Sequence, residues 1–409
     1  MTGLAKAMNL VNPEIEHHHE QTAYLSLFIA RHMGLPEEDV ILTLYSALLH
    51  DIGSIIVDEP QTVTEVEQNA LELSLTGARM LEDIPGCEEI AEVVRYSQCS
   101  WVDTVHCAVE EGETCERYGR IASIVHLSDT VSLLLDPEER VLNQANRITG
   151  IAKYCSGTQF SPEAVDAFID IAQTEYVWMD LMHNPMFLTY FTGEIAPVSL
   201  EDAIWPTLFM SRIIDYRSAF TAMHSAGVAA SATELARLAG MPEEDVLQMR
   251  IAGYLHDVGK LAVPRSILEK PGKLTTEEFN IVKEHPYYTS LVLLGIDGFE
   301  KIGHWAANHH EKLEGNGYPF HYPGDALDAG DRIMAVADVF SAITEERPYR
   351  KGMPREKALG ILREDVESKA LCGDIVSLLA ENYERVDAAR DEASRKAGKR
   401  YFESFGNAK

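Results

Sequence analysis

The sequence contains little that would suit a secreted or membrane-spanning protein. Its six cysteines are scattered at positions 87, 99, 107, 115, 155 and 372 without a Cys-x-x-Cys pair, which favours free thiols in a reducing compartment. No apolar run approaches the roughly 18 to 20 residues that span a bilayer, and the first residues lack the basic-then-apolar pattern of a secretory signal. We therefore expect a cytoplasmic protein without membrane insertion.

Positive charge is also scarce. The 409 residues include 35 Lys and Arg against 65 Asp and Glu, for a net charge of −30. Because contacts of Lys and Arg with phosphates supply most of the affinity for nucleic acid, this balance argues against a DNA or RNA polymer as partner. Residues 1–200 have 9 basic against 32 acidic residues, whereas residues 201–409 have 26 against 33. A small anionic ligand would therefore bind more readily to the second half.

Segments that alternate apolar and polar residues with period two are few, so little or no sheet is expected. Apolar residues instead recur with helical spacing, for example through residues 243–257. Thr275 followed by Glu278 fits a capping box that opens another helix. The length exceeds that of one ordinary core and predicts two domains. The sequence thus predicts an all-α protein.

One sequence pattern occurs twice, at an offset of 206 residues. The heptapeptide GLPEEDV at 34–40 aligns with GMPEEDV at 240–246, and HDIG at 50–53 aligns with HDVG at 256–259. Half of the twenty positions between these ends are identical. We interpret the chain as a tandem repeat of one helical unit.

The second copy carries imidazoles and carboxylates that suit metal ions. In chain order they are His224, His256, Asp257, His285, His309, His310 and Asp338. Neutral imidazole and carboxylate are the usual ligands of a divalent transition metal that activates water. Adjacent histidines are uncommon in a plain core, because each buried ring needs a polar partner. The pattern therefore favours a hydrolase with two metals.

With Lys260 and the tripeptide Gly317-Tyr318-Pro319, this string resembles the HD-GYP family of bacterial metal-dependent cyclic dinucleotide phosphodiesterases over residues 215–355. The resemblance implies tandem HD-domain helical bundles and hydrolysis of cyclic di-GMP, mainly to linear pGpG, by hydroxide that two metals activate. It implies that Asp257 bridges the metals. One metal would be completed by His224, His256 and Asp338, and the other by His285, His309 and His310. Iron or manganese is the occupant expected from the family.

The resemblance also assigns substrate contacts. Lys260 would contact a phosphate oxygen, and Arg347 and Arg350 would form forked bonds to phosphate. Gly317 and Pro319 belong to a loop whose backbone would pass close to the ligand.

Other residues near these motifs are expected to support the site. Tyr318 would contact a base or pack within its loop, and Glu311 would orient a ligand histidine. Phe220 stands where some family members carry the glutamate that accompanies a third metal. We therefore expect two metals and slow further cleavage to the mononucleotide.

The first copy has lost part of this chemistry. His18, His50, Asp51 and Asp129 remain and could hold one metal, as in simple HD domains. The positions of His285, His309, His310 and Lys260 are taken by Leu73, Ser97, Gln98 and Ser54. We expect this half to be regulatory, dimer-forming or structural, not catalytic.

Composition and the repeat suggest the domain boundaries. Residues 1–185 would form the degenerate HD-like domain, 186–215 a connecting segment with several prolines, 216–390 the catalytic HD-GYP domain and 391–409 a charged tail.

Several alternatives stay open. Nothing in the sequence distinguishes guanine from adenine, so a cyclic GMP-AMP dinucleotide is an alternative substrate. A generic HD nucleotide phosphohydrolase and an inactive cyclic dinucleotide-binding scaffold are further alternatives. A homodimer or a signalling protein partner would be compatible with each of them.

Overall fold

The computed structural model describes residues 2–10, 17–56, 63–82, 84–111, 113–183, 207–212, 214, 219–270, 272–345 and 352–405. Within these ranges every regular element is a helix, and the sole β-type contact is an isolated bridge between Ser156 and Phe160. The expected all-α fold is confirmed. None of the helices in the described ranges is both long enough and apolar enough to cross a bilayer.

The chain forms two compact units, which we call the first unit (Val11–Ala196) and the second unit (Met1–Leu10 with Pro197–Lys409). The first unit contains α2 (His18–His32), α3 (Glu37–Leu49), η2 (Ile52–Ile56), α4 (Val63–Glu82), α5 (Glu88–Tyr96), α6 (Trp101–Glu111), α7 (Glu113–Leu133), α8 (Val141–Tyr154), α9 (Pro162–Ile171) and α10 (Glu175–Met182). Its core forms where α2 packs on α3 and α7, and where α5 packs on α4 and α7.

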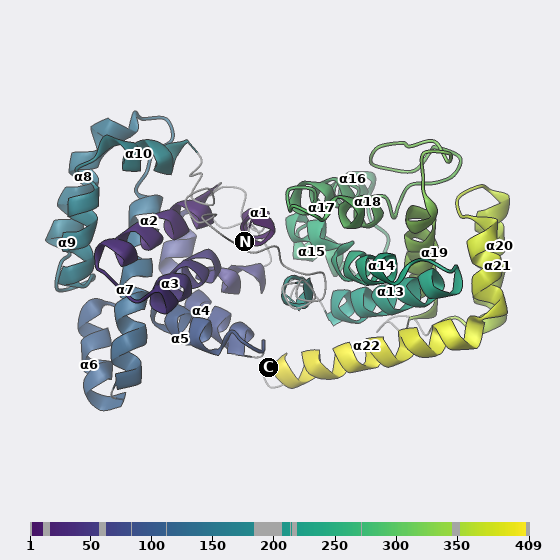
Figure 1. Cartoon of the computed structure of the whole chain (residues 1–409), viewed down its shortest axis with the longest axis horizontal. Helices are drawn as coiled ribbons and strands as arrows, with labels where there is room; N and C mark the ends of the chain where they lie inside the picture. Colours follow the sequence, from purple (N-terminus) through teal and green to yellow (C-terminus); the bar gives the residue numbers. More distant parts are fainter. Residues whose placement is uncertain are drawn as a thin grey trace. The chain divides into compact units, whose positions relative to one another are not determined.

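The second unit repeats this arrangement around a central helix, α13. Its helices are α1 (Thr2–Asn9), α13 (Ala219–Leu238), α14 (Glu243–Leu255), η3 (Val258–Ala262), α15 (Arg265–Leu268), α16 (Thr276–Val282), α17 (His285–Leu293), α18 (Glu300–Ala307), α19 (Ala329–Thr344), α20 (Arg355–Glu367), α21 (Gly373–Glu381) and α22 (Tyr383–Phe405). Helix α13 packs against α14, α19 and α22, and the long α22 runs beside it in Figure 1. The predicted capping box of Thr275 and Glu278 opens α16.

The duplicated sequence adopts the same local geometry in both units. Gly34 and Gly240 end α2 and α13 with φ of 69° and 74°, a left-handed conformation that glycine adopts without steric cost. Pro36 and Pro242 then cap α3 and α14 with nearly identical dihedral angles. The acidic first turn of each following helix suits the positive end of its dipole. The repeat read from the sequence is therefore a structural repeat.

A second pair of glycines fixes how the His-Asp doublet meets the next helix. A Cβ atom at Gly259 would lie 2.0 Å from the carbonyl oxygen of His285, and one at Gly53 would lie 2.1 Å from that of Leu73. Such distances are far inside van der Waals contact, so each 3-10 helix needs glycine to approach its neighbour. Because the two contacts correspond, Leu73 occupies the position of His285, as the alignment predicted.

Two expected boundaries differ from the structure. The sequence predicts that α1 belongs to the first domain, residues 1–185. In the structure it packs on α17 and η3 of the second unit. The side chain of Met8 is fully buried there, and Lys6 donates to the carbonyl of Leu291 at 3.3 Å. Apolar burial therefore attaches the first ten residues to the second unit.

The expected tail at 391–409 is also not a separate segment, because α22 continues through it as one helix as far as Phe405. Ser394 is buried, and its hydroxyl donates to the carbonyl of Met223 at 2.9 Å, which ties this part of α22 to α13. Small residues permit the close contact: at Gly398 a Cβ atom would lie 2.9 Å from the sulfur of Met223. Most of the expected connecting segment 186–215 lies outside the described residues.

The docking of α1 predicts an effect of Met8→Asp. A carboxylate in place of the buried thioether would detach α1, and losing a buried methionine costs ~2 kcal/mol or more. At ~2–4 °C per kcal/mol, we expect the melting temperature of the second unit to fall by roughly 5 °C or more in calorimetry. Met8→Leu, which preserves volume, serves as the control. Equal melting temperatures for both variants would show that α1 contributes nothing to the second unit.

Candidate metal centre

All seven predicted metal ligands of the second unit lie together in the structure. They come from α13, the junction of α14 and η3, the first residue of α17, the turn after α18 and the middle of α19. Three groups bring ligand atoms within 4.8 Å of one another, namely His285 with His309 and His310, His224 with His256 and Asp338, and His256 with Asp257 and His309. Five distant stretches of sequence thus converge on one buried point.

Backbone carbonyls orient three of these histidines. Nδ1 of His256, His285 and His309 donates to the carbonyl three residues earlier in the chain, at 2.8, 2.6 and 2.6 Å. A carbonyl only accepts hydrogen bonds, so Nδ1 of each ring carries the hydrogen and Nε2 presents a lone pair. This is the tautomer that binds a metal through Nε2.

The lone pairs of His285 and His309 face each other. Their Nε2 atoms lie 3.3 Å apart, and with Nδ1 of each ring already donating, two neutral rings leave no hydrogen to share between those atoms. Burial lowers the pKa of His285 to about 3 and that of His309 to about 4, so both rings are neutral near pH 7. Burial likewise holds the pKa of His310 well below its usual value. Neutral imidazoles whose lone pairs face one another can bind a cation placed between them.

Asp257 divides its two carboxylate oxygens between the groups. Oδ2 lies 3.3 Å from Nε2 of His256 and 4.0 Å from Nε2 of His224, whereas Oδ1 lies 3.3 Å from Nε2 of His285 and 3.9 Å from that of His309. The side chain is almost wholly buried. One carboxylate therefore faces two clusters of imidazole nitrogens, which is the arrangement of a bridging ligand.

Two cations compensate the buried carboxylates. Lys260, three residues beyond Asp257 in η3, donates to its Oδ2 at 2.6 Å. Burial opposes ionisation of Asp257, but the adjacent imidazole of His256 and the ammonium of Lys260 hold the pKa of this carboxyl well below its usual value. Lys260 was predicted to contact phosphate, and the structure places its ammonium at the edge of the metal centre.

His224 contacts two carboxylates and is the second cation. Its Nε2 lies 3.0 Å from Oδ1 of Asp338, and its Nδ1 lies 3.1 Å from Oε2 of Glu345. Burial alone would lower the pKa of His224, but these two bonds raise it to about 9. Glu345 was not predicted from the sequence. Glu345 follows Asp338 by seven residues. Because seven residues make about two helical turns, both side chains lie on the same helix face, and this spacing could have identified Glu345.

The donor set fits divalent metal ions. Among the described residues, neither Nε2 of His256 nor Oδ1 of Asp257 has a hydrogen-bond partner, although both atoms are buried. Buried polar atoms are rarely left in this state, and each would gain a bond from a metal ion. The imidazole and carboxylate donors are those of iron, manganese and zinc sites. These residues are therefore suited to hold two ions joined by Asp257.

The tripeptide 317–319 borders the centre. Tyr318 packs its ring 4.8 Å from that of His310, and its backbone N–H donates to the carbonyl of His310 at 3.3 Å. A Cβ atom at Gly317 would lie 2.5 Å from Cα of Glu311, so glycine is needed here for backbone packing. The peptide bond between Tyr318 and Pro319 is cis.

The predicted role of Glu311 is wrong. Its Oε1 accepts hydrogen bonds from the backbone N–H groups of Phe320 and His321, at 2.7 and 3.1 Å, and not from a ligand histidine. Glu311 is buried under the loop that contains Gly317-Tyr318-Pro319, and it holds that loop in place. The histidines are oriented by carbonyls and by Glu345 instead.

Two expectations concern residues that the structure does not describe. Arg347 and Arg350, the predicted phosphate contacts after Asp338, lie outside the described residues. The backbone of Phe220 is part of α13, but its side chain lies outside them as well.

The four predicted ligands of the first unit also converge. Nε2 of His18 lies 3.1 Å from Oδ1 of Asp129, Nε2 of His50 lies 3.2 Å from Oδ2 of Asp51, and the two Nε2 atoms are 3.2 Å apart. Nδ1 of His50 donates to the carbonyl of Ala47 at 2.8 Å, which repeats the orientation seen at His256.

His19 belongs to this cluster and was not predicted. It is buried beside His50 and Asp51, and its Nδ1 has no hydrogen-bond partner among the described residues. Burial lowers the pKa of His19 to about 3, so the ring is neutral. The run of three histidines at 17–19 was the signal that could have pointed to it.

The second metal position is missing from the first unit. Ser97 donates to the carbonyl of Val94, the same bond to residue i−3 that His309 makes in the second unit, but it offers no imidazole. Gln98 occupies the position of His310 and donates to Oδ2 of Asp129 at 2.8 Å. Together with Leu73, these residues replace all three histidines of the group formed by His285, His309 and His310 in the second unit.

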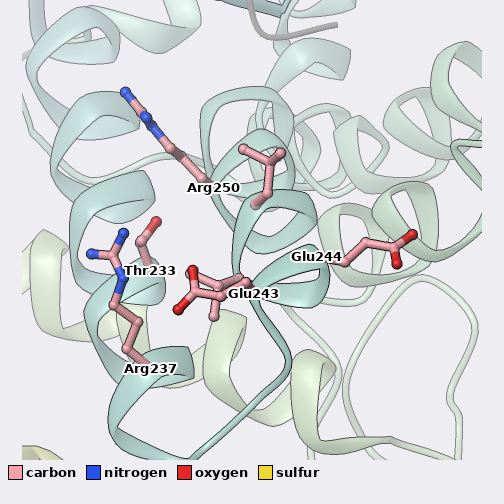
Figure 2. A pocket seen from close by; sticks show the side chains of 7 residues that line it. Thr233, Arg237, Glu243, Glu244 and Arg250 are labelled. Atoms are coloured by element: carbon pink, nitrogen blue, oxygen red, sulfur yellow. The ribbon is translucent and has the colours of Figure 1, made fainter. Parts of the chain in front are cut away.

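A hollow of about 590 Å³ lies elsewhere in the second unit, between α13 and the start of α14. Figure 2 shows Thr233 and Arg237 facing Glu243, with Glu244 turned to the other side. Its lining residues on α14 run from Glu243 to Arg250, which precede His256 by roughly 20 and 9 Å along the helix. Its mixture of charges and its distance from the metal ligands distinguish it from the candidate site.

Comparison with known proteins agrees with this architecture. Two HD-domain family models match, one over residues 15–134 and the other over residues 209–370. A 3'3'-cGAMP-specific phosphodiesterase 3 of Vibrio cholerae is 30% identical, over 77% of this chain and 69% of the relative. A cyclic di-GMP phosphodiesterase of Pseudomonas aeruginosa is 41% identical over 34% of each chain.

A crystal structure of a cyclic GMP-AMP specific phosphodiesterase of Vibrio cholerae shares the fold. It superposes with a TM-score of 0.62 at 23% identity and covers 94% of this chain and 96% of the other. The ordered ligands, the two matching family models and the relative that spans most of the chain lead to one conclusion. The chain belongs to the HD-GYP family of HD-domain phosphodiesterases, and it carries two HD domains in tandem.

Proposed function

We propose that the second unit hydrolyses a cyclic dinucleotide, and that cyclic di-GMP is converted mainly to linear pGpG. The observation that carries this proposal is the position of Asp257, whose two oxygens face separate groups of metal-ligand histidines. The relatives that act on cyclic dinucleotides support the substrate class. A 3'3'-cGAMP substrate is the second candidate, because a relative that spans 77% of this chain bears that specificity in its name.

The chain's residues would divide the work as follows. Asp257 would be shared by two divalent ions, of which iron or manganese is proposed; His224, His256 and Asp338 would hold one of them, and His285, His309 and His310 the other. When bound, such a pair lowers the pKa of water and offsets charge on the phosphoryl oxygens. Lys260, whose ammonium donates to Asp257, would bind a phosphate oxygen. Glu345 keeps His224 oriented through Nδ1.

The first unit is proposed to hold one ion and to act as a structural or regulatory domain. Its cluster includes five donors, His18, His19, His50, Asp51 and Asp129, all buried. Gln98 occupies the side on which the second ion would bind. A single buried ion without a partner ion suits stability or regulation better than the cleavage of a phosphodiester.

Turnover tests the central proposal. Full-length protein loaded with iron or manganese under reducing conditions should cleave cyclic di-GMP, and chromatography should show pGpG as the main product. Asp257→Asn preserves shape but removes the bridging charge, and we expect it to lower turnover more than about 100-fold. Asp51→Asn, the same change in the first unit, is the matched control and should retain turnover.

The same assay separates the alternatives. Faster turnover of 3'3'-cGAMP than of cyclic di-GMP would select the second candidate. Cleavage of nucleoside polyphosphates without cleavage of cyclic dinucleotides would indicate a generic HD hydrolase, and binding without cleavage would indicate a scaffold.

Elemental analysis tests the two metal sites. We expect about three ions per chain, two in the second unit and one in the first, given one complete and one partial ligand set. His50→Ala should remove about one ion, and His256→Ala should reduce the second unit's share. A wild-type content of about two ions that His50→Ala leaves unchanged would show that the first unit binds none.

The lowered pKa values predict how acid affects the metal-free protein. His285 and His309 titrate near pH 3 and 4 when folded but near 6.5 when unfolded. Between pH 6.5 and 4 the unfolded chain therefore binds protons that the folded chain does not, and stability is lost as pH falls. The urea midpoint of metal-free protein should decrease across this window, and His285→Gln with His309→Gln should flatten the decrease. A midpoint that stays constant from pH 6.5 to 4 would contradict this assignment.

A further inference from the structure

A second hollow, which we call the aromatic pocket, adjoins the metal centre. It measures about 750 Å³ and lies between the last turn of α16, the first turn of α17 and the loop after Gly317. Its walls include Tyr287, Tyr288, Tyr318 and Phe320, with Lys283 and Glu284 among the polar groups. Tyr318 joins the two regions, because its ring lies 4.8 Å from that of His310.

The aromatic side chains of this region are unusually accessible. Tyr287 is 48% exposed, and Phe279, whose ring lies 6.4 Å from that of Tyr318, is 45% exposed. Large apolar side chains that gather on a surface beside a reaction site commonly mark a ligand-binding surface. Every nucleobase has a flat face that stacks on tyrosine or phenylalanine.

A cyclic dinucleotide needs such a surface. Its two nucleotides are joined into a ring by two phosphodiester bonds, and each carries a base. When one phosphodiester lies at the metal centre, a base must therefore lie close to that centre. The aromatic pocket is a hollow beside the centre, and four of its lining residues are tyrosine or phenylalanine. The hydrogen-bonding atoms at the rim of the pocket then determine which nucleobase it binds.

Glu284 favours guanine at that rim. Its carboxylate accepts hydrogen bonds only, and one oxygen accepts from the hydroxyl of Tyr288 at 3.4 Å. The Watson-Crick edge of guanine presents two adjacent donors, N1–H and the N2 amino group, which a carboxylate can accept together. The same edge of adenine offers a donor beside an acceptor, and a carboxylate would leave that acceptor facing a negative charge.

We infer that the aromatic pocket is a guanine subsite, in which Tyr287 stacks on the base and Glu284 reads its Watson-Crick edge. This inference rests on the proposed function and adds a determinant of base specificity to it. Lys283, in the same wall, contributes positive charge toward the second phosphate of the ligand. Both cyclic di-GMP and 3'3'-cGAMP contain a guanine that the subsite can take.

The test compares kcat and KM of full-length, metal-loaded protein on cyclic di-GMP and on cyclic di-AMP. Tyr287→Ala should raise KM for cyclic di-GMP roughly 5- to 100-fold, the usual effect of losing one stacking partner, while kcat changes by less than about twofold. Glu284→Gln should raise KM for cyclic di-GMP and lower it for cyclic di-AMP, since an amide matches the adenine edge. Tyr176→Ala, which removes a tyrosine of 50% exposure from the first unit, is the matched control.

The outcomes separate this inference from the proposed function. If wild-type protein cleaves cyclic di-GMP but Tyr287→Ala and Glu284→Gln behave as Tyr176→Ala does, the subsite is overturned and the proposed function stands. If no cyclic dinucleotide is cleaved, calorimetric titration with cyclic di-GMP decides: binding that Tyr287→Ala weakens supports the subsite alone. Absence of binding to wild-type protein overturns it.

Discussion

The second unit is organised around a buried cluster of imidazole nitrogens and carboxylate oxygens. Most of these atoms accept hydrogen bonds, and the cluster holds few hydrogens to donate to them. Three imidazoles turn their Nε2 lone pairs inward because backbone carbonyls hold their Nδ1 hydrogens. They surround two buried carboxylates, Asp257 and Asp338. Burying such a group without compensation is costly, so positive charge must be supplied at this point. Without metal it comes from the Lys260 ammonium and the protonated ring of His224.

This balance means that metal binding and proton release are linked. A metal ion bound to Nε2 of His224 would displace the hydrogen that bonds to Asp338, and an ion on Asp257 would compete with the ammonium of Lys260. The residue that compensates charge in the metal-free protein is thus the same one that we propose binds phosphate.

The two units show which residues convert one helical scaffold into two kinds of site. The glycine contact beside the His-Asp doublet, the proline cap and the carbonyl that orients the doublet histidine are the same in both. The two sites differ in the side chains that this shared backbone carries. Leucine, serine and glutamine stand in the first unit in place of three histidines of the second, whereas His19 adds a buried imidazole to the first unit's cluster.

The sequence predicted the fold class, the repeat and the convergence of the ligands, because the motif spacing specifies which helix end carries each side chain. It did not predict the partner of Glu311, since a buried carboxylate next to two histidines has several candidate donors and only the path of the following loop selects two backbone N–H groups. Glu345 and His19 were identifiable in principle, from helical spacing and from a histidine run. The docking of α1 was not, because an eight-residue helix does not reveal which surface it will cover.

That docking has a consequence for how the protein can be divided. Because the first ten residues complete the second unit, the polypeptide enters one body, leaves it to build the other, and then returns. A fragment that starts at the second HD domain would lack the buried Met8 and expose the faces of η3 and α17 that it covers. The first unit is therefore inserted within the sequence of the second. Cutting the chain at any single position cannot release both units intact.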